Sequence, residues 1–288
     1  MKNKITLKKS VKIINNDYVL KKKTTNLTNI YNYLLSRSFD YFPEIIKEDN
    51  NNIYYKYIPD IDEPKEQKII DLINVLTLLH SKTTMYKEID LDNYKYLYEE
   101  INKEIDDIFN YYNTIMDNIE SSIYMSPSNY LISRNISFIY SSINYAKRSI
   151  DYWYKLIENK RKVRVVITHN NLSLDHYLKN DKPYLISWDL SKIDMPIYDL
   201  ISLYNNHYLE FDFTELLQIY LNKYPLLEEE IALFLTIISI PKKIIYDNSE
   251  YKNVLNIRRQ LDYLYKTSEL VKKYNVTQKT EKQWKLQH

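Results

Sequence analysis

The residues whose types could do chemistry gather in one stretch, ITHNNLSLDHYL at residues 167–178, which a short SWD segment soon follows. The stretch and its SWD segment contain two imidazoles, His169 and His176, and two carboxylates, Asp175 and Asp189. Such side chains can move protons or bind a metal ion such as zinc or manganese. Because the spacing of the two histidines, His-x6-His, matches no zinc motif, we expect His169 to be a buried structural residue and His176 to face the loop.

Two apolar segments must position this stretch. Residues 163–168 form a continuous run rich in β-branched side chains, which predicts a buried strand. Residues 183–188 predict a second strand after the loop. Side chains at positions i and i+2 of a strand share a face, so Ser187 and Asp189 would point the same way if this strand continued.

The N-terminal part of the chain alternates between short strands and polar turns. Residues 10–14 and 18–23 predict a hairpin, and residues 44–48 and 53–58 predict a second pair of strands. Between the two pairs, residues 27–37 have the periodicity of an amphipathic helix. We therefore expect at least four strands and one helix before the segment PDIDEP.

The rest of the chain is dominated by helical periodicity, so the predicted fold class is α+β. PDIDEP, with its two prolines, is typical of an interlobe hinge. We predict an N-terminal β-rich lobe (residues 1–58), a hinge (59–65) and a helical C-terminal lobe (66–276). This second lobe would contain the loop segment (167–201) and would be followed by a polar tail (277–288).

Through the loop segment, the sequence resembles aminoglycoside phosphotransferases and choline kinases. That family carries HGDLHxxN, then a strand ending in IDWE or IDFD, then DPxYDLA, whereas this chain has HNNLSLDH, ISWD and DMPIYDL. The motifs cover residues 167–201 and the triplet Leu79-His80-Ser81, and the order of elements extends the likeness over most of the chain. The resemblance implies a two-lobed, protein-kinase-like fold with a small β-rich lobe and a large, mainly helical lobe.

The departures from the family's motifs fall on its catalytic positions. Asn171 stands where the family has its catalytic Asp, and an amide cannot take the proton of a substrate hydroxyl. His176 and Ser187 stand at the positions of the family's metal ligands. Both are poor ligands for Mg²⁺, which prefers carboxylate oxygens, so we do not expect Mg²⁺ to bind well.

The positions that support the loop in this family are retained. The resemblance implies that His169 packs beneath the loop, that Asp199 opens a helix and holds the loop backbone, and that Trp188 fills the core around them. A retained scaffold with replaced acid, base and metal ligands is typical of a pseudokinase.

In the N-terminal lobe, the resemblance implies a strand lysine that contacts nucleotide phosphates. Lys21 fits this position, with Lys22 or Lys23 as alternatives. Without a nucleotide role, Lys21 would simply be an exposed lysine on a strand. The family's glutamate partner should lie on the following helix, which contains no carboxylate here, and this leaves Glu44 as the nearest candidate. A ring near the hinge such as Tyr57 could stack on an adenine, although core packing is the default for a tyrosine.

The composition excludes several classes of site. Because the chain has no glycine, it can form neither a Gly-rich P-loop nor a GxGxxG fingerprint, and backbone positions with positive φ must be filled by Asn or Asp. The turn at residues 15–17 could stand where a phosphate-covering loop would be, but its side chains would keep its amides at a distance. With no cysteine there is no disulfide, thiolate zinc site or cysteine nucleophile.

Charge and hydropathy narrow the choice of partners. The net charge is +2, from 40 basic and 38 acidic side chains, which gives no electrostatic footprint for nucleic acid. The N-terminus lacks the apolar region of a signal peptide, and the longest apolar run is too short to span a bilayer. We therefore expect a cytoplasmic protein with no membrane insertion.

We expect a catalytically impaired, kinase-like protein that acts by binding a nucleotide, with ATP as the candidate, or another protein. Two alternatives remain open. One is an active ATP-dependent phosphotransferase for a small hydroxylated substrate, in which Asp189 and Asp175 act in shifted roles. The other is a helical scaffold whose cleft is filled by side chains.

Overall fold

The computed structural model describes residues 5–8, 11–25 and 27–275, so the predicted polar tail at 277–288 lies outside the described residues. The elements of the N-terminal part, in chain order, are β1 (Ile5–Lys8), β2 (Val11–Ile14), β3 (Tyr18–Lys22), α1 (Thr28–Ser36), β4 (Ile45–Glu48), β5 (Asn52–Lys56), α2 (Lys65–Thr83) and β6 (Met85–Glu88). They are followed by α3 (Leu91–Ser121), α4 (Pro127–Ile157), β7 (Lys162–Thr168), β8 (Tyr177–Lys179), β9 (Pro183–Leu185), β10 (Lys192–Asp194), α5 (Ile197–His207), α6 (Phe213–Lys223), α7 (Glu228–Ser239) and α8 (Glu250–Tyr274).

The chain divides into two compact units. The first contains Met1–Met85, Val165–Asn206 and Ile219–Tyr224, and the second contains Tyr86–Arg164, His207–Gln218 and Pro225–His288. The first unit therefore holds both the N-terminal strands and the loop after β7. The lobe boundaries expected from the sequence, with a hinge at residues 59–65, divide the chain differently and stay a prediction.

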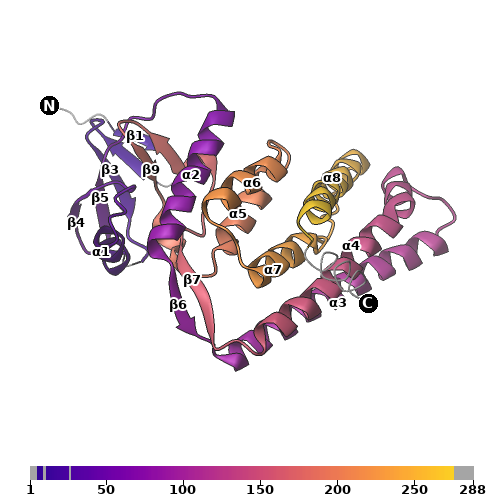
Figure 1. Cartoon of the computed structure of the whole chain (residues 1–288). Coiled ribbons are helices and arrows are strands. Elements are labelled where there is room, and N and C mark those ends of the chain that lie inside the picture. The colour runs from indigo at the N-terminus through magenta and orange to yellow at the C-terminus, as the bar shows by residue number, and fades with distance from the viewer. Residues whose placement is uncertain (1–4, 9–10, 26, 276–288) are drawn as a thin grey trace. The chain divides into compact units, whose positions relative to one another are not determined.

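The first unit is built on an antiparallel sheet in the order β1-β2-β3-β5-β4 (Figure 1). The sequence predicted four of these strands but missed β1, whose ITLK segment alternates apolar and polar residues inside a lysine-rich N-terminus. Helix α1 contributes the buried Tyr31 and Leu34 to the core of this unit. Tyr31 stacks on Phe42 with 4.4 Å between the ring centroids.

The loop segment of the first unit lies between short strands. Strand β7 is buried from Val163 to Thr168, as predicted, and its end pairs with β10. Strands β8 and β9 form a hairpin after the loop. The prediction that the second strand continues to Trp188 is wrong, because β9 ends at Leu185 and Ser187 adopts a left-handed conformation with φ 67°.

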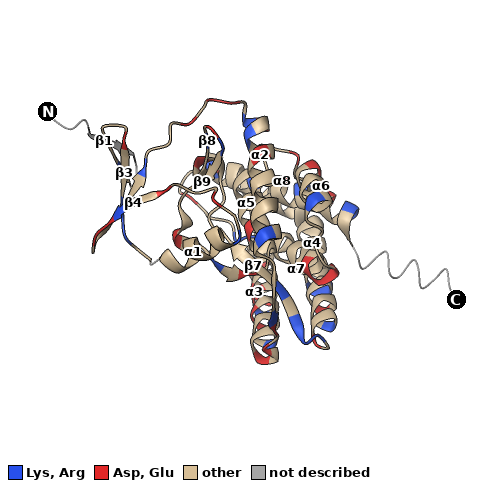
Figure 2. Ribbon diagram, turned by 60° about the vertical axis from the view of Figure 1, so that its left-hand side comes forward, with Lys and Arg blue, Asp and Glu red and all other residues tan. Residues whose placement is uncertain are grey.

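The second unit is helical. Helices α3 and α4 are amphipathic, and α4 buries Ile132, Ile139, Ile143 and Ile150 along one face. Acidic side chains dominate the charge of α3, which carries eight Asp and Glu against two Lys (Figure 2). Among the described helices, none combines the length and the apolar character needed to cross a bilayer.

Positive-φ positions are filled without glycine. The described residues with positive φ are Asn15, Asn16, Ser38, Asn170 and Ser187, so serine serves where the sequence led us to expect only Asn or Asp. Ser38 follows the end of α1 with φ 56°, and the N–H of Phe39 donates to the Leu34 carbonyl over 2.9 Å. This is the helix-ending pattern in which glycine is usual.

Ser38→Gly should therefore stabilise the protein by about 1 kcal/mol, because Ser38 is exposed and a left-handed residue with a Cβ is strained. Urea unfolding of the two proteins measures the difference. Ser36→Gly, inside the last turn of α1, is the matched control and should cost roughly 0.5 kcal/mol. A loss of stability in Ser38→Gly would contradict the assignment of strain to this residue.

Candidate functional site

The loop after β7 is anchored by a buried carboxylate. Asp199, at the start of α5, is fully buried. Its Oδ2 accepts the N–H of His169 over 2.9 Å and its Oδ1 accepts the N–H of Asn170 over 2.6 Å. These two bonds fix the backbone at the point where β7 ends and Asn170 takes a positive φ of 55°.

Asp199 is in turn held by a histidine that the sequence analysis did not connect with the loop. His80 Nε2 lies 3.1 Å from Asp199 Oδ2, and His80 Nδ1 lies 2.7 Å from the hydroxyl of Tyr220. Because the carboxylate can only accept, Nε2–H donates to Asp199, and in the neutral ring the Tyr220 hydroxyl then donates to Nδ1. The signal was present in the sequence: His80 continues the apolar face of α2, where a polar side chain needs a buried partner.

His169 and Trp188 lie in the core beneath the loop. His169 Nε2–H donates to the Ile186 carbonyl over 2.9 Å, and its ring meets Trp188 edge-on with 4.8 Å between centroids. Burial lowers the pKa of His169 to about 4, so the ring is neutral near pH 7. Trp188 donates its indole N–H to the Leu185 carbonyl over 2.7 Å and is surrounded by aromatic rings, those of Tyr31, Phe39 and Phe42.

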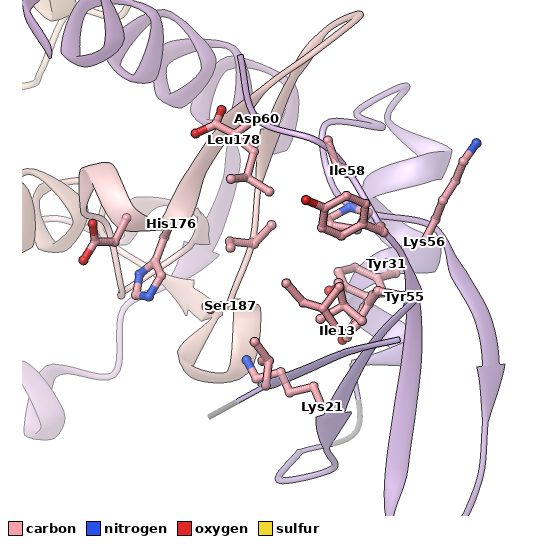
Figure 3. A pocket seen from close by; sticks show the side chains of 16 residues that line it. Ile13, Lys21, Tyr31, Tyr55, Lys56, Ile58, Asp60, His176, Leu178 and Ser187 are labelled. Carbon is pink, nitrogen blue, oxygen red and sulfur yellow. The ribbon is translucent and has the colours of Figure 1, made fainter. Parts of the chain in front are cut away.

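A cavity of about 660 Å³ opens beside the loop (Figure 3). Ile13 and Val19 line it from β2 and β3, and Leu178 and Ile186 line it from the β8–β9 hairpin region. In the close-up, Ile13, Tyr55 and Ile58 lie on one side and Leu178 and His176 on the other. The volume and the largely apolar walls are in the range of small-molecule sites.

The structure brings several of the sequence-predicted residues to this cavity. Those that line it are Lys21, Tyr57, Asp175, His176 and Ser187. Lys21 and Ser187 lie toward one end, and Asp60 lies toward the other (Figure 3).

Two predicted residues adjoin the cavity without lining it. The carbonyl of Asn171 lies 2.6 Å from His176 Nδ1 and accepts its hydrogen. In the neutral ring this leaves the lone pair of Nε2 as an acceptor. Asp189 forms an ion pair with Lys21, and Lys21 lines the cavity.

Lys21 has an ion-pair partner that the sequence analysis did not assign to it. Its Nζ contacts the carboxylate of Asp189, and the Thr24 hydroxyl donates to Asp189 Oδ1 over 3.1 Å. The suggestion that Glu44 is the partner is wrong, because the described structure pairs Lys21 with Asp189. Asp189 reaches Lys21 because the left-handed Ser187 and the 3₁₀ turn Trp188–Leu190 end the strand and redirect the chain.

The zinc or manganese site considered for His169, His176, Asp175 and Asp189 does not form. Within residues 5–8, 11–25 and 27–275, no group of three or more His, Cys, Asp or Glu side chains is placed to hold a metal ion. His169 is committed to the Ile186 carbonyl and Asp189 to Lys21.

The turn at residues 15–17 does not cover the Lys21 end of the cavity. It joins β2 to β3, and Asp17 accepts the N–H of Tyr57 through its carbonyl over 2.9 Å. Lys21 pairs with Val11 at the opposite end of β2.

Solved structures with the same arrangement of elements identify the fold. An aminoglycoside phosphotransferase from Alicyclobacillus acidocaldarius subsp. acidocaldarius superposes with a TM-score of 0.70 at 8% identity, over 94% of this chain and 92% of that one. The chain has the aminoglycoside phosphotransferase fold. The predicted two-lobed, kinase-like α+β class is thereby confirmed.

Two further proteins share the phosphotransferase fold. A spectinomycin phosphotransferase, solved with ADP and spectinomycin, has a TM-score of 0.51 at 12% identity over 92% of this chain and 93% of that one. A glucosamine kinase, solved with glucosamine, ADP and inorganic phosphate, has a TM-score of 0.50 at 9% identity over 97% of this chain and 81% of that one. No protein-family model matches this sequence, and no curated protein matches it.

The burial of His169 predicts a pH dependence of stability. Its pKa is about 4 when folded against an ordinary value of 6.5, so the unfolded chain binds the proton first as the pH falls. The contribution is fully present above pH 6.5 and is lost toward pH 4, for a total of roughly 3 kcal/mol of unfolding free energy. Urea unfolding at several pH values should show that His169→Gln has a shallower loss over this window than the unmodified protein. If the unfolding free energies of the two proteins fell in parallel with pH, the assignment of this pH dependence to His169 would be contradicted.

Proposed function

We propose that this protein is a pseudokinase: it binds a nucleotide-class ligand in the cavity beside the loop and does not transfer phosphate efficiently. One observation carries the proposal. An open cavity of about 660 Å³ has apolar walls facing each other and a strand lysine at one end, while the catalytic positions nearby hold Asn171, His176 and Ser187.

The walls suit a flat heteroaromatic ring. Ile13 and Leu178 lie on opposite sides of the cavity (Figure 3), and Tyr57 and Ile58, just before the predicted hinge, also line it. Apolar side chains on both faces of a ring remove its surface from water, which is the main favourable term for a ligand of this kind. The spectinomycin phosphotransferase and the glucosamine kinase with the same fold were both solved with ADP, which supports a nucleotide-class ligand.

The catalytic positions do not suit phosphoryl transfer. That reaction depends on metal ions that neutralise the transferring group and on a carboxylate that accepts the proton of the attacking hydroxyl. Asn171 offers an amide where the carboxylate is needed. The carboxylate of Asp189 is bound by Lys21 and Thr24, which argues against the active alternative in which it serves as the acid or metal ligand.

The scaffold alternative requires a cleft filled by side chains, and the cavity argues against it. The alternative of a protein partner lacks a comparable structural support, because the cavity has the dimensions of a small-molecule site. We therefore favour binding of a small ligand over a scaffold role and over binding of a protein partner.

Thermal unfolding with adenine nucleotides and adenosine, with EDTA or with Mg²⁺ or Mn²⁺, tests the proposal. A ligand at about 100 times its dissociation constant stabilises the folded state by roughly 2.7 kcal/mol, which shifts the midpoint visibly. We expect a shift that needs no metal, together with no measurable turnover of ATP. A metal-dependent shift with turnover, both lost in Asp189→Asn, would establish the active enzyme instead.

The position of the ligand is tested by filling the cavity. Val19→Trp should abolish the shift, since Val19 lines the cavity from β3. Tyr18→Trp is the matched control, because adjacent residues of a strand point to opposite faces and Tyr18 does not line the cavity. Unfolding of each variant without ligand verifies that it folds. An unchanged shift in Val19→Trp would move the ligand elsewhere, and no shift in any protein would favour the scaffold.

A further inference from the structure

The linker that joins the sheet to α2, residues 57–64, is fastened to the β8–β9 hairpin. The N–H of Ile61 donates to the Lys179 carbonyl over 2.8 Å, and the N–H of Lys179 donates to Asp60 Oδ1 over 2.8 Å. The other carboxylate oxygen of Asp60 is paired with Lys68 over 2.8 Å. Both backbone hydrogen-bonding groups of Lys179 are therefore committed to the linker.

The side chain of Lys179 adds a second tie. Its Nζ contacts the carboxylate of Asp71 on α2 and lies 3.2 Å from Glu63 Oε2 in the linker. The side chains of Asp71 and Glu63 are only 19% and 10% exposed, so water screens these ion pairs only in part. One residue of the hairpin thus holds the linker and the helix that follows it.

The tip and the second strand of the hairpin are held to the segment that follows α1. Lys182 binds the carboxylate of Asp40, and its Nζ lies 5.7 Å from the ring centroid of Tyr41 and 5.5 Å from that of Tyr184. The N–H of Leu185 donates to the Tyr41 carbonyl over 2.8 Å. The hairpin is therefore tied to the N-terminal part of the first unit as well as to the linker.

These ties oppose a hinge motion in the linker. Such a motion requires a few residues whose φ and ψ can change freely. Pro59 and Pro64 have a fixed φ, and three of the four residues between them bind Lys179. Both walls of the cavity, from the sheet and from the hairpin region, belong to the first unit. A change in the linker backbone would have to break several of these bonds together.

We propose that Lys179 is a locking residue: it fastens the linker to the β8–β9 hairpin, so that the two walls of the cavity form one rigid body and the cavity keeps its width before any ligand binds. A site that is formed in advance loses less free energy to ordering when its ligand binds. The inference rests on the proposed function only for what the cavity holds, because the width of the cavity can be measured without a ligand.

Distances between two spin labels, measured by pulsed electron paramagnetic resonance, test the lock. The chain has no cysteine, so Lys12→Cys on β2 and Ser81→Cys on α2 place one label on each side of the linker. Both positions are exposed, and Lys12 lies between two strand residues that line the cavity and so points away from it. We expect one narrow distance distribution that adenosine and ATP leave unchanged.

Removing the ammonium group of Lys179 should release the linker. In Lys179→Met the distance distribution should become roughly twofold wider, because the ties to Asp71 and Glu63 are lost. Asp71→Asn keeps the lysine and should widen the distribution less. Lys192→Met, which breaks an ion pair on β10, makes the same change in net charge and should leave the distribution narrow. Thermal unfolding verifies that each variant folds, and if Lys179→Met does not, Asp71→Asn decides.

The results that would overturn the lock can be told apart from a failure of the proposed function. A broad or two-peaked distribution in the unmodified protein, or an unchanged one in both Lys179→Met and Asp71→Asn, would reject the lock. A shorter distance on adding adenosine or ATP would reject it too, while supporting nucleotide-class binding. If neither ligand binds but Lys179→Met still widens a narrow distribution, the lock stands and the proposed function is rejected.

Discussion

The buried carboxylate of Asp199 is the group on which the geometry of the loop depends. It is fully buried and accepts from the backbone of His169 and Asn170 and from His80. A buried carboxylate is tolerated only when its oxygens are well supplied with donors, and here two donors come from the loop and the third from α2. The loop, α2 and α5 are thus fixed to each other by one side chain, and Tyr220 extends the network to α6.

The absence of glycine imposes a second constraint, and it acts at Ser187. A left-handed residue here costs free energy when it carries a Cβ, yet the chain adopts it and turns into the 3₁₀ segment at Trp188. The turn buries Trp188 among the rings of Tyr31, Phe39 and Phe42 and brings Asp189 to Lys21. Packing of a large ring and an ion pair together offset the strain of one backbone position.

The sequence predicted individual elements best where the pattern was strong, as in the continuous apolar run of β7 and the helical periodicity of α1. It missed β1 because four residues of alternation are hard to separate from a basic terminus. At the site, the sequence shows which residue types occupy the catalytic positions of the loop. It could not predict the partner of Lys21, because Asp189 is far from Lys21 in sequence. Asp189 reaches Lys21 only because Ser187 is left-handed, and the residues around Ser187 do not predict that conformation.

The residues that support the loop and the residues at the catalytic positions differ in how deeply they are buried. His169, Trp188 and Asp199 are almost completely inaccessible, so replacing any of them would leave an unpaired polar group or a void in the core. Asn171, His176 and Ser187 are only partly buried. A change of side chain at such positions alters what the site can bind or transfer and disturbs the packing little. A phosphotransferase fold can therefore lose its catalytic groups while its core stays intact, and the ligand that then fits best is decided by the charges and hydrogen-bonding groups left at the edge of the cavity.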